Sequence, residues 1–498
     1  MEVFDEIHVI SDLHLGGPTG RQSFTGTSLL TGFIDKLCEP AEEPRRIALV
    51  INGDFVDFLA EPDACLFDVA EANRKLDRIF KEDESFSPIR EALSRFVVTA
   101  GQTLVIVLGN HDLELAAPSV QQHFAELVGA DPASRHRIRW STTGEGFSAS
   151  VCDQTVLCLH GNEVDPFNVM DYETLAQRIR DVEHGASPES WVPNAGTQLV
   201  IEVMNGIKQR LPFVDLLKPE TDAVLPLLAA LGEVTQARID RMSDVALRVG
   251  VDSIRMKLGL LSDEDGAAET DVTSSSSLLS ADFAAMVTRE TDWKTVSPEE
   301  AARYLIFATE QRFRQGTDPW RLASPQQETL GLWNLSKAGV RWLWSHFSSR
   351  SPTEQLRFAL QYLLRDRSFD LAYRDDAFKR IDKLVDSNAD IVVAGHTHLE
   401  RVLTRRSGGK YFNTGTWARL MRMDSKILES ASDFEVYYHA LKASSMTKLE
   451  PFVTHRPTVV SIADRGGRVI AELQRVRRDS RRNIVLTAPE IETKEVGA

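Results

Sequence analysis

The stretch Val9-Ile10-Ser11-Asp12-Leu13-His14-Leu15 sets the expectation for the whole chain. An apolar run leads directly into a carboxylate at Asp12, and an imidazole follows two residues later at His14. Residues at i and i+2 of an extended chain share a face, and ligands gather at the carboxyl ends of strands in α/β sheets. The pattern predicts a buried strand that delivers two metal ligands just past its end.

Four later stretches repeat the arrangement of an apolar run followed by polar residues. Short runs rich in Val, Ile and Leu are typical of the buried strands of a parallel sheet. Helical patterns lie between them, so we expect an α/β layered fold with the polar clusters along one edge of the sheet. The four runs and the residues that follow are 46–52 with Gly53-Asp54, 103–108 with Gly109-Asn110-His111-Asp112, 155–159 with His160, and 389–394 with Gly395-His396-Thr397-His398.

Periodicity and turn residues predict the remaining elements. The expected helices are 27–38, 69–100, 119–129, 195–210 and 375–388, and the further strands are 3–11, 146–152, 401–405, 410–414, 434–440, 457–462 and 467–475.

The domain organisation changes near residue 166. The α/β pattern of 1–165 gives way to an almost entirely helical region at 166–388, within which the Ser- and acid-rich segment 261–278 is expected to be a mobile loop. The α/β pattern resumes at 389–483, and 484–498 is expected to be a flexible tail. A large helical insertion thus interrupts one α/β unit.

Composition narrows the classes of partner and compartment. The 498 residues carry a formal net charge of −16, which disfavours binding to the phosphate backbone of nucleic acid. Four cysteines without a C-x-x-C pair favour a reducing compartment, and no signal peptide is recognised, so we expect a cytoplasmic protein. No apolar run approaches the ~18 residues of a spanning helix, although peripheral membrane contact stays open.

The polar clusters supply the donors for a metal site. Two carboxylates, one amide oxygen and four imidazoles can enclose two divalent ions, and mixed nitrogen and oxygen ligation suits Mn²⁺, Fe²⁺ or Zn²⁺. Asp54 is the natural bridging ligand because its glycine turn leaves it central. Two cations about 3.5–4 Å apart lower the pKa of a bridging water and clamp an in-line displacement, which predicts hydrolysis of a phosphate ester. The predicted ligands are Asp12, His14, Asp54, Asn110, His160, His396 and His398.

The five blocks D-x-H, G-D-x-x-D, G-N-H-D, H-G and G-H-T-H, in this order, resemble the calcineurin-like metallophosphoesterase superfamily. Residues 1–165 and 389–416 carry the resemblance. It implies a layered β-sandwich flanked by helices, and direct attack on phosphorus by a metal-bridging hydroxide without a phosphoenzyme. It also assigns the ligands: Asp12, His14, Asp54 and His398 to one metal, and Asp54, Asn110, His160 and His396 to the other.

The same resemblance implies the catalytic residues. His111 matches the histidine that contacts the phosphate and protonates the leaving group, and Asp112 matches its orienting partner. Asn413-Thr414-Gly415-Thr416 resembles the closing strand and turn of the family.

A narrower resemblance is to the branch around UDP-2,3-diacylglucosamine hydrolase. It rests on Ser11-Asp12-Leu13-His14-Leu15-Gly16 and on His160-Gly161-Asn162-Glu163. Asn162 stands where that branch has Asp, and the helical insertion is far longer than its cap. The insertion leaves and returns beside the predicted site, so it is expected to be a cap, an interface of a homo-oligomer, or a pocket for the acyl chain of a lipid-linked substrate.

Several residues have two interpretations. Asp57 either caps a local turn or is a hydrogen-bond partner of a ligand, and Asp112 either caps the following turn or supports catalysis. Glu163 and Asp165 are interpreted as loop residues, with contact to substrate or to a ligand as the alternative, and Arg419 is a candidate for reaching a phosphate. The remaining histidines lack ligand-like spacing and are expected to be structural: His8, His123, His136, His184, His346, His439 and His455.

The predicted function is a dinuclear metal-dependent phosphohydrolase that acts on a small phosphorylated or lipid-linked substrate. A monoester, a diester and a pyrophosphate all fit this chemistry. A nuclease would need a basic channel, a protein phosphatase would need an open shallow site, and a non-catalytic scaffold would be expected to have lost ligands. The acidic composition, the predicted cap and the complete ligand set argue against these three alternatives in turn.

Overall fold

The structure is a computed structural model of the chain. The chain divides into two compact units, one formed by Met1–Pro193, Ser368–Arg419 and His455–Ala498, and the other by Asn194–Arg367 and Leu420–Thr454. The predicted loop 261–278 lies outside the residues that the structure describes, as does most of the predicted insertion. The described residues are 1–40, 42–165, 167–186, 191–217, 353, 357, 369–421 and 425–489.

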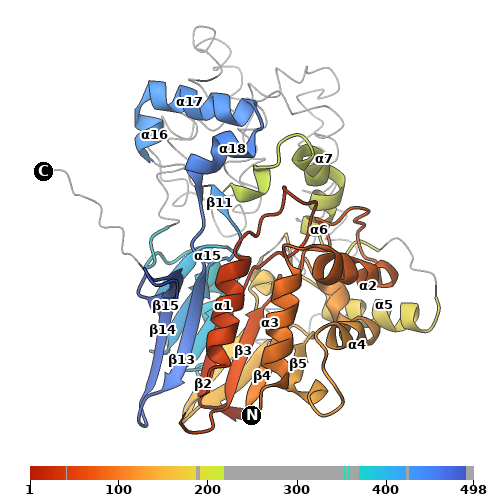
Figure 1. The fold of residues 1–498 in the computed structure, drawn as a ribbon, viewed down its shortest axis with the longest axis vertical. Coiled ribbons are helices and arrows are strands. Elements are labelled where there is room, and N and C mark those ends of the chain that lie inside the picture. Colours follow the sequence, from red (N-terminus) through yellow and green to blue (C-terminus); the bar gives the residue numbers. More distant parts are fainter. Residues whose placement is uncertain are drawn as a thin grey trace, which may run out of the picture. The chain divides into compact units, whose positions relative to one another are not determined.

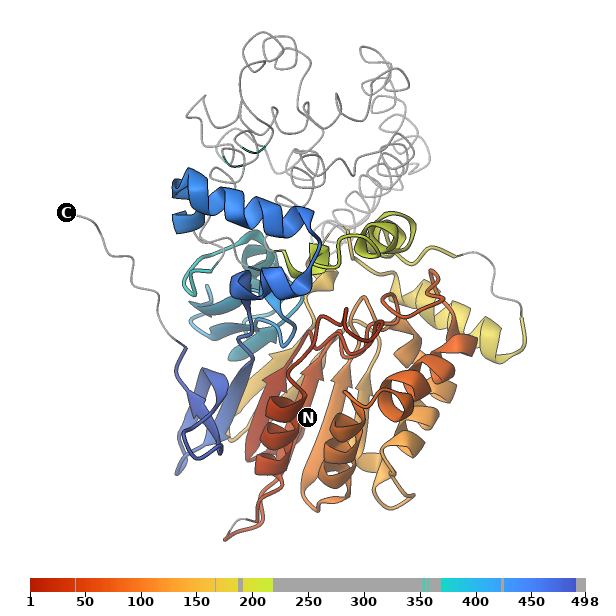
Figure 2. The same cartoon turned by 45° about the horizontal axis from the view of Figure 1, so that its top comes forward.

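A seven-stranded sheet in the order β15-β14-β13-β2-β3-β4-β5 forms the centre of the first unit (Figure 1). Strands β2 to β5 are parallel, whereas β13, β14 and β15 join antiparallel beside β2. The parallel strands therefore end at one edge (Figure 2). Their bounds are β2 Glu6–Ile10, β3 Ile47–Asn52, β4 Gln102–Val107, β5 Ile138–Ser141, β13 Thr458–Asp464, β14 Val469–Arg478 and β15 Ile484–Thr487.

A second sheet has six strands in the order β1-β6-β7-β8-β10-β9. Its neighbours β7, β8 and β10 are parallel, and β9 and β6 are antiparallel to β10 and β7. The predicted strand 3–11 is thus two strands, since β1 joins this sheet and β2 joins the other. The bounds are β1 Glu2–Phe4, β6 Phe147–Val151, β7 Gln154–Cys158, β8 Ile391–Ala394, β9 Glu400–Thr404 and β10 Lys410–Thr414.

The alternating side chains of β3 show how the layers are built. Leu49 and Ile51 belong to the core between the seven-stranded sheet and the helices, whereas Ala48 and Val50 belong to the core between the two sheets. Successive side chains of a strand point to opposite faces, so one apolar run fills two cores. The structure confirms the predicted mixed α/β sandwich with flanking helices.

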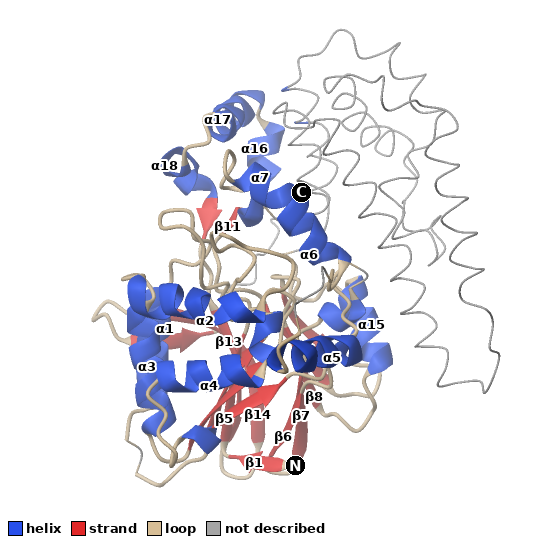
Figure 3. Ribbon diagram, turned by 90° about the vertical axis from the view of Figure 1, so that its right-hand side faces the viewer, coloured by secondary structure: helices blue, strands red, loops and turns tan. Residues whose placement is uncertain are grey.

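Helices cover both outer faces of this sandwich (Figure 3). Those between residues 27 and 183 contribute Phe33, Phe96 and Phe124 to the core against the seven-stranded sheet. On the other side, Phe378 and Ile381 pack against the six-stranded sheet. The helices are α1 Thr27–Leu37, α2 Val69–Asp77, the π-helix η1 Arg78–Glu82, α3 Ser87–Val98, α4 Pro118–Leu127, α5 Tyr172–Glu183 and α15 Asp376–Leu384, with 3-10 turns η2 Leu113–Ala116, η3 Arg135–Arg137 and η4 Asn162–Val164.

The described part of the second unit is mainly helical. Residues 195–208 form a helical run, as predicted, with a π-helical turn in its middle. No helix in the described part of the chain combines the length and apolarity that a bilayer crossing requires. The elements are α6 Ala195–Leu199, η5 Val200–Met204, α7 Asn205–Lys208, η6 Val214–Leu216, β11 Leu420–Met421, α16 Ser425–Glu429, α17 Ala431–Lys442, α18 Met446–Leu449, η8 Glu450–Phe452 and β12 Val453–Thr454.

One expectation about the C-terminal part is wrong. The predicted strand 434–440 is part of α17, because Phe434, Tyr437, Tyr438 and Leu441 follow the three- and four-residue spacing of one buried helix face. Residues 420–454 accordingly group with the second unit rather than with the α/β unit.

The predicted tail is also ordered where it begins. Ile484–Thr487 forms β15, which pairs antiparallel with the end of β14. Ile484 is buried in the helix-side core, and this burial supplies the contact that local composition did not reveal.

Candidate metal centre

The predicted ligands follow the carboxyl ends of five strands. Asp12, Asp54 and Asn110 come after the neighbouring parallel strands β2, β3 and β4. His160 and His396 come after the neighbouring parallel strands β7 and β8 of the other sheet. Because the two sheets pack face to face, both sets of strand ends meet at one edge of the sandwich.

The backbone at these strand ends takes an unusual conformation. Few residues other than glycine adopt a positive φ, and those that do cluster at functional sites. Nine such residues occur in the described part of the chain, and five of them are predicted ligands, which makes strain at this edge a feature of the site. The five are Asp12, His14, Asp54, His396 and His398, with φ between 47° and 68°.

The first group of ligand atoms comes from Asp12, His14, Asp54 and His398, whose donors all lie within 4.8 Å of one another. The Nε2 atoms of His14 and His398 are 3.0 Å apart. His398 Nε2 lies 3.2 Å from Asp12 Oδ1, and His14 Nε2 lies 3.6 Å from Asp54 Oδ2. Two carboxylates and two imidazoles therefore converge on one small volume.

The second group comes from Asp54, His160 and His396, again within 4.8 Å. His160 Nδ1 lies 2.9 Å from the Asn52 carbonyl oxygen, so this nitrogen donates its hydrogen. The other nitrogen, Nε2, lies 3.3 Å from Asp54 Oδ2 and is the one left to face a cation. Asp54 belongs to both groups, which is the position that a bridging carboxylate needs.

Asn110, a predicted ligand of the same cation, lies in the loop that follows β4. The next residue, His111, donates its backbone N–H to Asp54 Oδ1 at 2.9 Å. The Asn110 side chain is buried, and its Oδ1 has no hydrogen-bond partner among the described residues. A buried amide oxygen without a donor is costly, and a divalent cation would satisfy it.

The charges of the site also fit divalent cations. The Asp12 and Asp54 carboxyls are fully buried, and burial raises their pKa. The histidines around them lower the pKa by more than burial raises it, so that both pKa values lie below the usual one. Burial lowers the pKa of His160, yet the Asp54 carboxylate outweighs it and raises that pKa to about 10. The protein alone thus holds protons between carboxylates and imidazoles, where cations would take their place.

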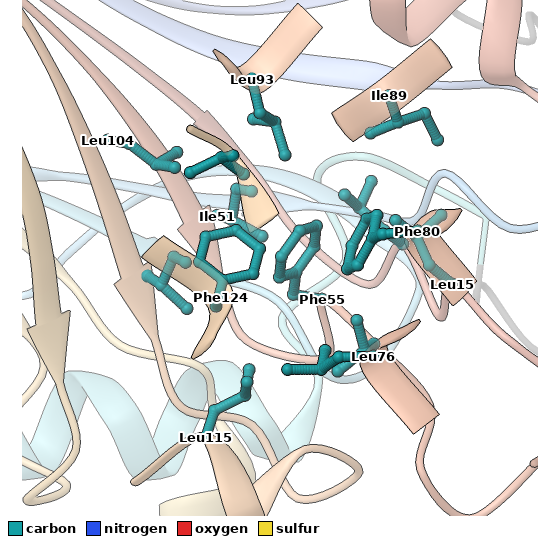
Figure 4. Packing of buried hydrophobic residues seen from close by; sticks show 14 of the residues in the cluster. Leu15, Ile51, Phe55, Leu76, Phe80, Ile89, Leu93, Leu104, Leu115 and Phe124 are labelled. Atoms are coloured by element: carbon teal, nitrogen blue, oxygen red, sulfur yellow. The ribbon is translucent and has the colours of Figure 1, made fainter. Parts of the chain in front are cut away.

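An aromatic cluster fixes the turn that carries Asp54. Phe55, the next residue, lies 5.6 Å between ring centroids from both Phe80 and Phe124 (Figure 4). All three rings are fully buried in the helix-side core. Packing of this kind contributes about 0.5–1.5 kcal/mol per aromatic pair beyond the buried area, and it holds Asp54 at the strand end.

His111 lies at the more exposed side of the centre, and Asp57 is its carboxylate neighbour. His111 Nδ1 lies 3.1 Å from Asp57 Oδ1, and Asp57 Oδ2 lies 3.4 Å from His14 Nδ1. Asp57 Oδ1 also accepts hydrogen bonds from the backbone of Leu59 and Ala60. Both interpretations of Asp57 therefore apply, as a turn cap and as a partner of site histidines.

Asp112 has a different environment from the one that its resemblance implies. Its two oxygens accept backbone hydrogen bonds from Gly109 at 2.7 Å and Phe55 at 2.8 Å. Burial and the nearby Asp54 carboxylate raise the Asp112 pKa to about 7. These contacts tie together the loops after β3 and β4.

Sequence reasoning undervalued the loop after His160. Asp165 Oδ2 lies 2.7 Å from His396 Nε2, so this carboxylate contacts a predicted ligand. Glu163 instead accepts a hydrogen bond from the Gly161 backbone, as a loop residue does. Asn168, which sequence reasoning did not single out, contacts both Asp165 and Asn110. No local sequence pattern marks Asn168, because its contact with Asn110 joins two loops that are far apart in sequence.

The closing turn braces the ligand loops. Asn413 donates to the Gly395 carbonyl at 2.7 Å, and Thr416 donates to the Asp12 carbonyl at 2.8 Å. The Arg419 guanidinium donates to the Gln22 carbonyl at 2.7 Å. Among the described residues, the histidines that were expected to be structural belong to neither ligand group. His346 is not among the described residues.

Comparison with known families agrees with this geometry. The calcineurin-like phosphoesterase family model matches residues 6–207, which include four of the five strand ends. No curated protein matches the chain. The family match makes residues 6–207 similar to calcineurin-like phosphoesterases, and together with the clustered aspartate and histidine side chains it supports a metal-dependent phosphoesterase in general.

Proposed function

We propose that this protein hydrolyses a phosphate ester or a phosphoanhydride with the help of two divalent cations. The observation that carries the proposal is the pair of ligand groups that share Asp54. One carboxylate between two sets of buried donors is the arrangement that a two-metal phosphoesterase requires. Mn²⁺, Fe²⁺ and Zn²⁺ suit the mixed imidazole and carboxylate donors.

The residues would divide the work as follows. Asp12, His14, Asp54 and His398 would hold one cation, and Asp54, Asn110, His160 and His396 the other. When bound, the cations supply an activated water and neutralise charge on the phosphoryl group. His111 is the group that would donate a proton to the leaving oxygen, and Asp57 keeps the His111 ring in place from its Nδ1 side.

The substrate class is part of the proposal. We favour a small phosphorylated or lipid-linked molecule over nucleic acid, which the net charge of −16 disfavours. A relation to the UDP-2,3-diacylglucosamine hydrolase branch, a homo-oligomeric state and a cytoplasmic location are proposed on the sequence motifs, the long insertion and the sparse cysteines.

Hydrolysis of p-nitrophenyl phosphate and bis-p-nitrophenyl phosphate would test the function. Mn²⁺, Zn²⁺, Fe²⁺ or Mg²⁺ would be added to metal-stripped wild-type protein, to Asp54→Ala and to the control Asp35→Ala, which removes only a surface ion pair between α1 and Arg95. We expect metal-restored turnover that Asp54→Ala abolishes and Asp35→Ala keeps. Failure of the wild-type protein to bind any of the cations would overturn the proposal.

The same assay separates the enzyme from a non-catalytic scaffold. His111→Ala should lower kcat by about 10²–10⁴-fold, the usual contribution of a general acid, while both cations stay bound. A scaffold would show no turnover to lose, although it would bind metal equally well.

A further inference from the structure

We propose that Asp165 and Asn168 are positioning residues that orient His396 and Asn110 toward the same cation. The inference rests on the proposed function and adds to it two residues that do not themselves touch metal or substrate. It follows from a network of three hydrogen bonds between side chains. These bonds connect Asn110 to Asn168, Asn168 to Asp165, and Asp165 to His396.

The network is anchored by the Asp165 carboxylate, which can only accept hydrogen bonds. Asp165 Oδ2 lies 2.7 Å from His396 Nε2, and a carboxylate has no hydrogen to give, so Nε2 must carry one. The lone pair of the neutral ring is then on Nδ1, and this is the nitrogen left for a cation. Asp165 thereby selects both the tautomer and the rotation of the His396 ring.

The same oxygen orients two amides in turn. Asn168 donates from Nδ2 to Asp165 Oδ2 at 2.7 Å, which leaves its Oδ1 to face Asn110. Asn110 responds by donating from Nδ2 to that oxygen at 3.3 Å. Its own Oδ1 must then point elsewhere, and this is the buried oxygen that has no hydrogen-bond partner in the described part of the chain.

The backbone of Asn168 is held as well. Asn162 donates from its Nδ2 to the Asn168 carbonyl at 3.1 Å, and Asp165 accepts from the backbone of Phe167 at 3.0 Å. An aspartate at position 162 has no hydrogen to donate to that carbonyl. The side-chain amide of Asn162 therefore helps to hold Asn168 in one orientation.

The test is metal binding by the full-length protein, measured without reference to turnover. Metal-stripped protein is titrated calorimetrically with Mn²⁺, and Co²⁺ is added in parallel to record the visible absorption of each site. The variants are Asn168→Ala, Asp165→Asn, and the exchange Asp165→Asn with Asn168→Asp. Asp171→Asn is the control, because Asp171 caps α5 through Thr174 and asparagine caps equally well.

We expect Asn168→Ala and Asp165→Asn to weaken one of two cation sites by about 10–100-fold, the usual effect of losing a partner of a ligand. The other site and Asp171→Asn should stay at wild-type affinity. Asn168→Ala removes no charge, so its effect reports orientation. In the exchange variant, the amide oxygen at position 165 can accept from His396, and its NH₂ group can donate to the carboxylate at position 168. That carboxylate can in turn accept from Asn110. The exchange variant should therefore bind the cation more tightly than either single variant.

Two results would overturn the inference. One is wild-type affinity and an unchanged Co²⁺ spectrum in both single variants; the other is equal weakening of both sites, which would indicate a general structural role. In either case two cations bound to the wild-type protein would leave the proposed function intact. A wild-type protein that binds no cation would contradict the proposed function itself.

Discussion

Asp57 connects two histidines with different predicted tasks. One oxygen contacts His111 Nδ1 and the other lies beside His14 Nδ1. Its pKa lies well below the usual value, because the charges and hydrogen bonds of these histidines outweigh the effect of burial. An ionised carboxylate here fixes the orientation of each ring. The contact with His111 Nδ1 favours Asp57 over Asp112 as the residue that orients the His111 ring.

Asp57→Asn should lower kcat by about 10–100-fold at saturating metal. Asparagine still caps the Leu59 turn, so folding should survive, but the charge beside His111 is lost. Hydrolysis kinetics of Asp57→Asn, His111→Gln and the double variant would check this, with metal content measured for each. Since Asp57 is expected to act through His111, the double variant should be no slower than His111→Gln. Full additivity would instead assign the effect to another contact, such as His14.

At the scale of elements, glycine lets strand ends approach one another. Gly53 follows β3 with φ +85°, and a Cβ there would overlap the His160 ring that follows β7. Gly395 follows β8, and a Cβ there would lie 2.7 Å from Asp12 Oδ2. These contacts are closer than real Cβ atoms tolerate, so the two sheets can bring their ligands together only where the side chain is absent.

Gly53→Ala should therefore abolish tight binding of one cation by displacing His160. Gly20→Ala is a matched control, because Gly20 has φ +82° and no described atom lies within 4 Å of the position that an added Cβ would take. Both substitutions incur the backbone strain of a positive φ, and only the first meets a ligand. Metal titration and circular dichroism of the two variants would check it; equal losses in both would point to strain rather than displacement.

Glu6 joins separate elements at the other end of the sandwich. Its carboxylate contacts His8 at 3.1 Å, Arg45 at 2.7 Å and Arg465 at 3.3 Å, and these residues come from β2, the approach to β3 and the turn after β13. The His8 hydrogen bond, against the opposing effect of burial and with the help of the positive charges, lowers the Glu6 pKa to about 2.

The sign of the pH dependence follows from this lowered pKa. The unfolded chain has the ordinary glutamate pKa, so the stabilisation is complete above about pH 4.5 and disappears as the pH falls toward about 2. Glu6→Gln should lower the free energy of unfolding by about 1–2 kcal/mol at pH 7, allowing for the exposure of both arginines, and much less near pH 2.5.

Chemical denaturation at several pH values would check the Glu6 prediction. Glu2→Gln is the control, because Glu2 pairs with Arg139 on the surface, and loss of such a pair should cost about 0.5 kcal/mol or less. A Glu6→Gln effect that is the same at pH 7 and pH 2.5 would contradict the electrostatic explanation.

For the first unit as a whole, the predicted ligands come from both sheets. Asp12, Asp54 and Asn110 follow strands of the seven-stranded sheet, and His160 and His396 follow strands of the six-stranded sheet. Cations held between them would bind the folded unit and not the unfolded chain. Such binding stabilises by about 2.7 kcal/mol per site at a free concentration one hundred times Kd.

Metal removal should accordingly lower the Tm of the protein by several degrees. Scanning calorimetry with a chelator and with added Mn²⁺ would measure the shift, and Asp54→Asn should show a much smaller one because the shared ligand is impaired. If the wild-type Tm stayed the same while calorimetric titration showed two bound cations, the proposed linkage between the sheets would be wrong.

Sequence by itself predicted the α/β layering and the position of the candidate metal ligands directly after buried strands. Buried parallel strands such as Ile47–Asn52 are continuous apolar runs, and the polar residues after them stand out against that background. The same local signals failed at 434–440, where aromatic residues suit a strand or a helix equally, and at Ile484–Thr487, where burial against distant elements decides the outcome.

Only the tertiary structure decided which side chains contact the predicted ligands. Asp57 rather than Asp112 contacts the His111 ring, and Asp165 and Asn168 reach His396 and Asn110 across loops far apart in sequence. Hydrogen bonds depend on distance and direction between groups, and neither is encoded in local spacing. A ligand type can be read from a motif, whereas the partner that fixes its tautomer or rotation is set by how the two sheets pack.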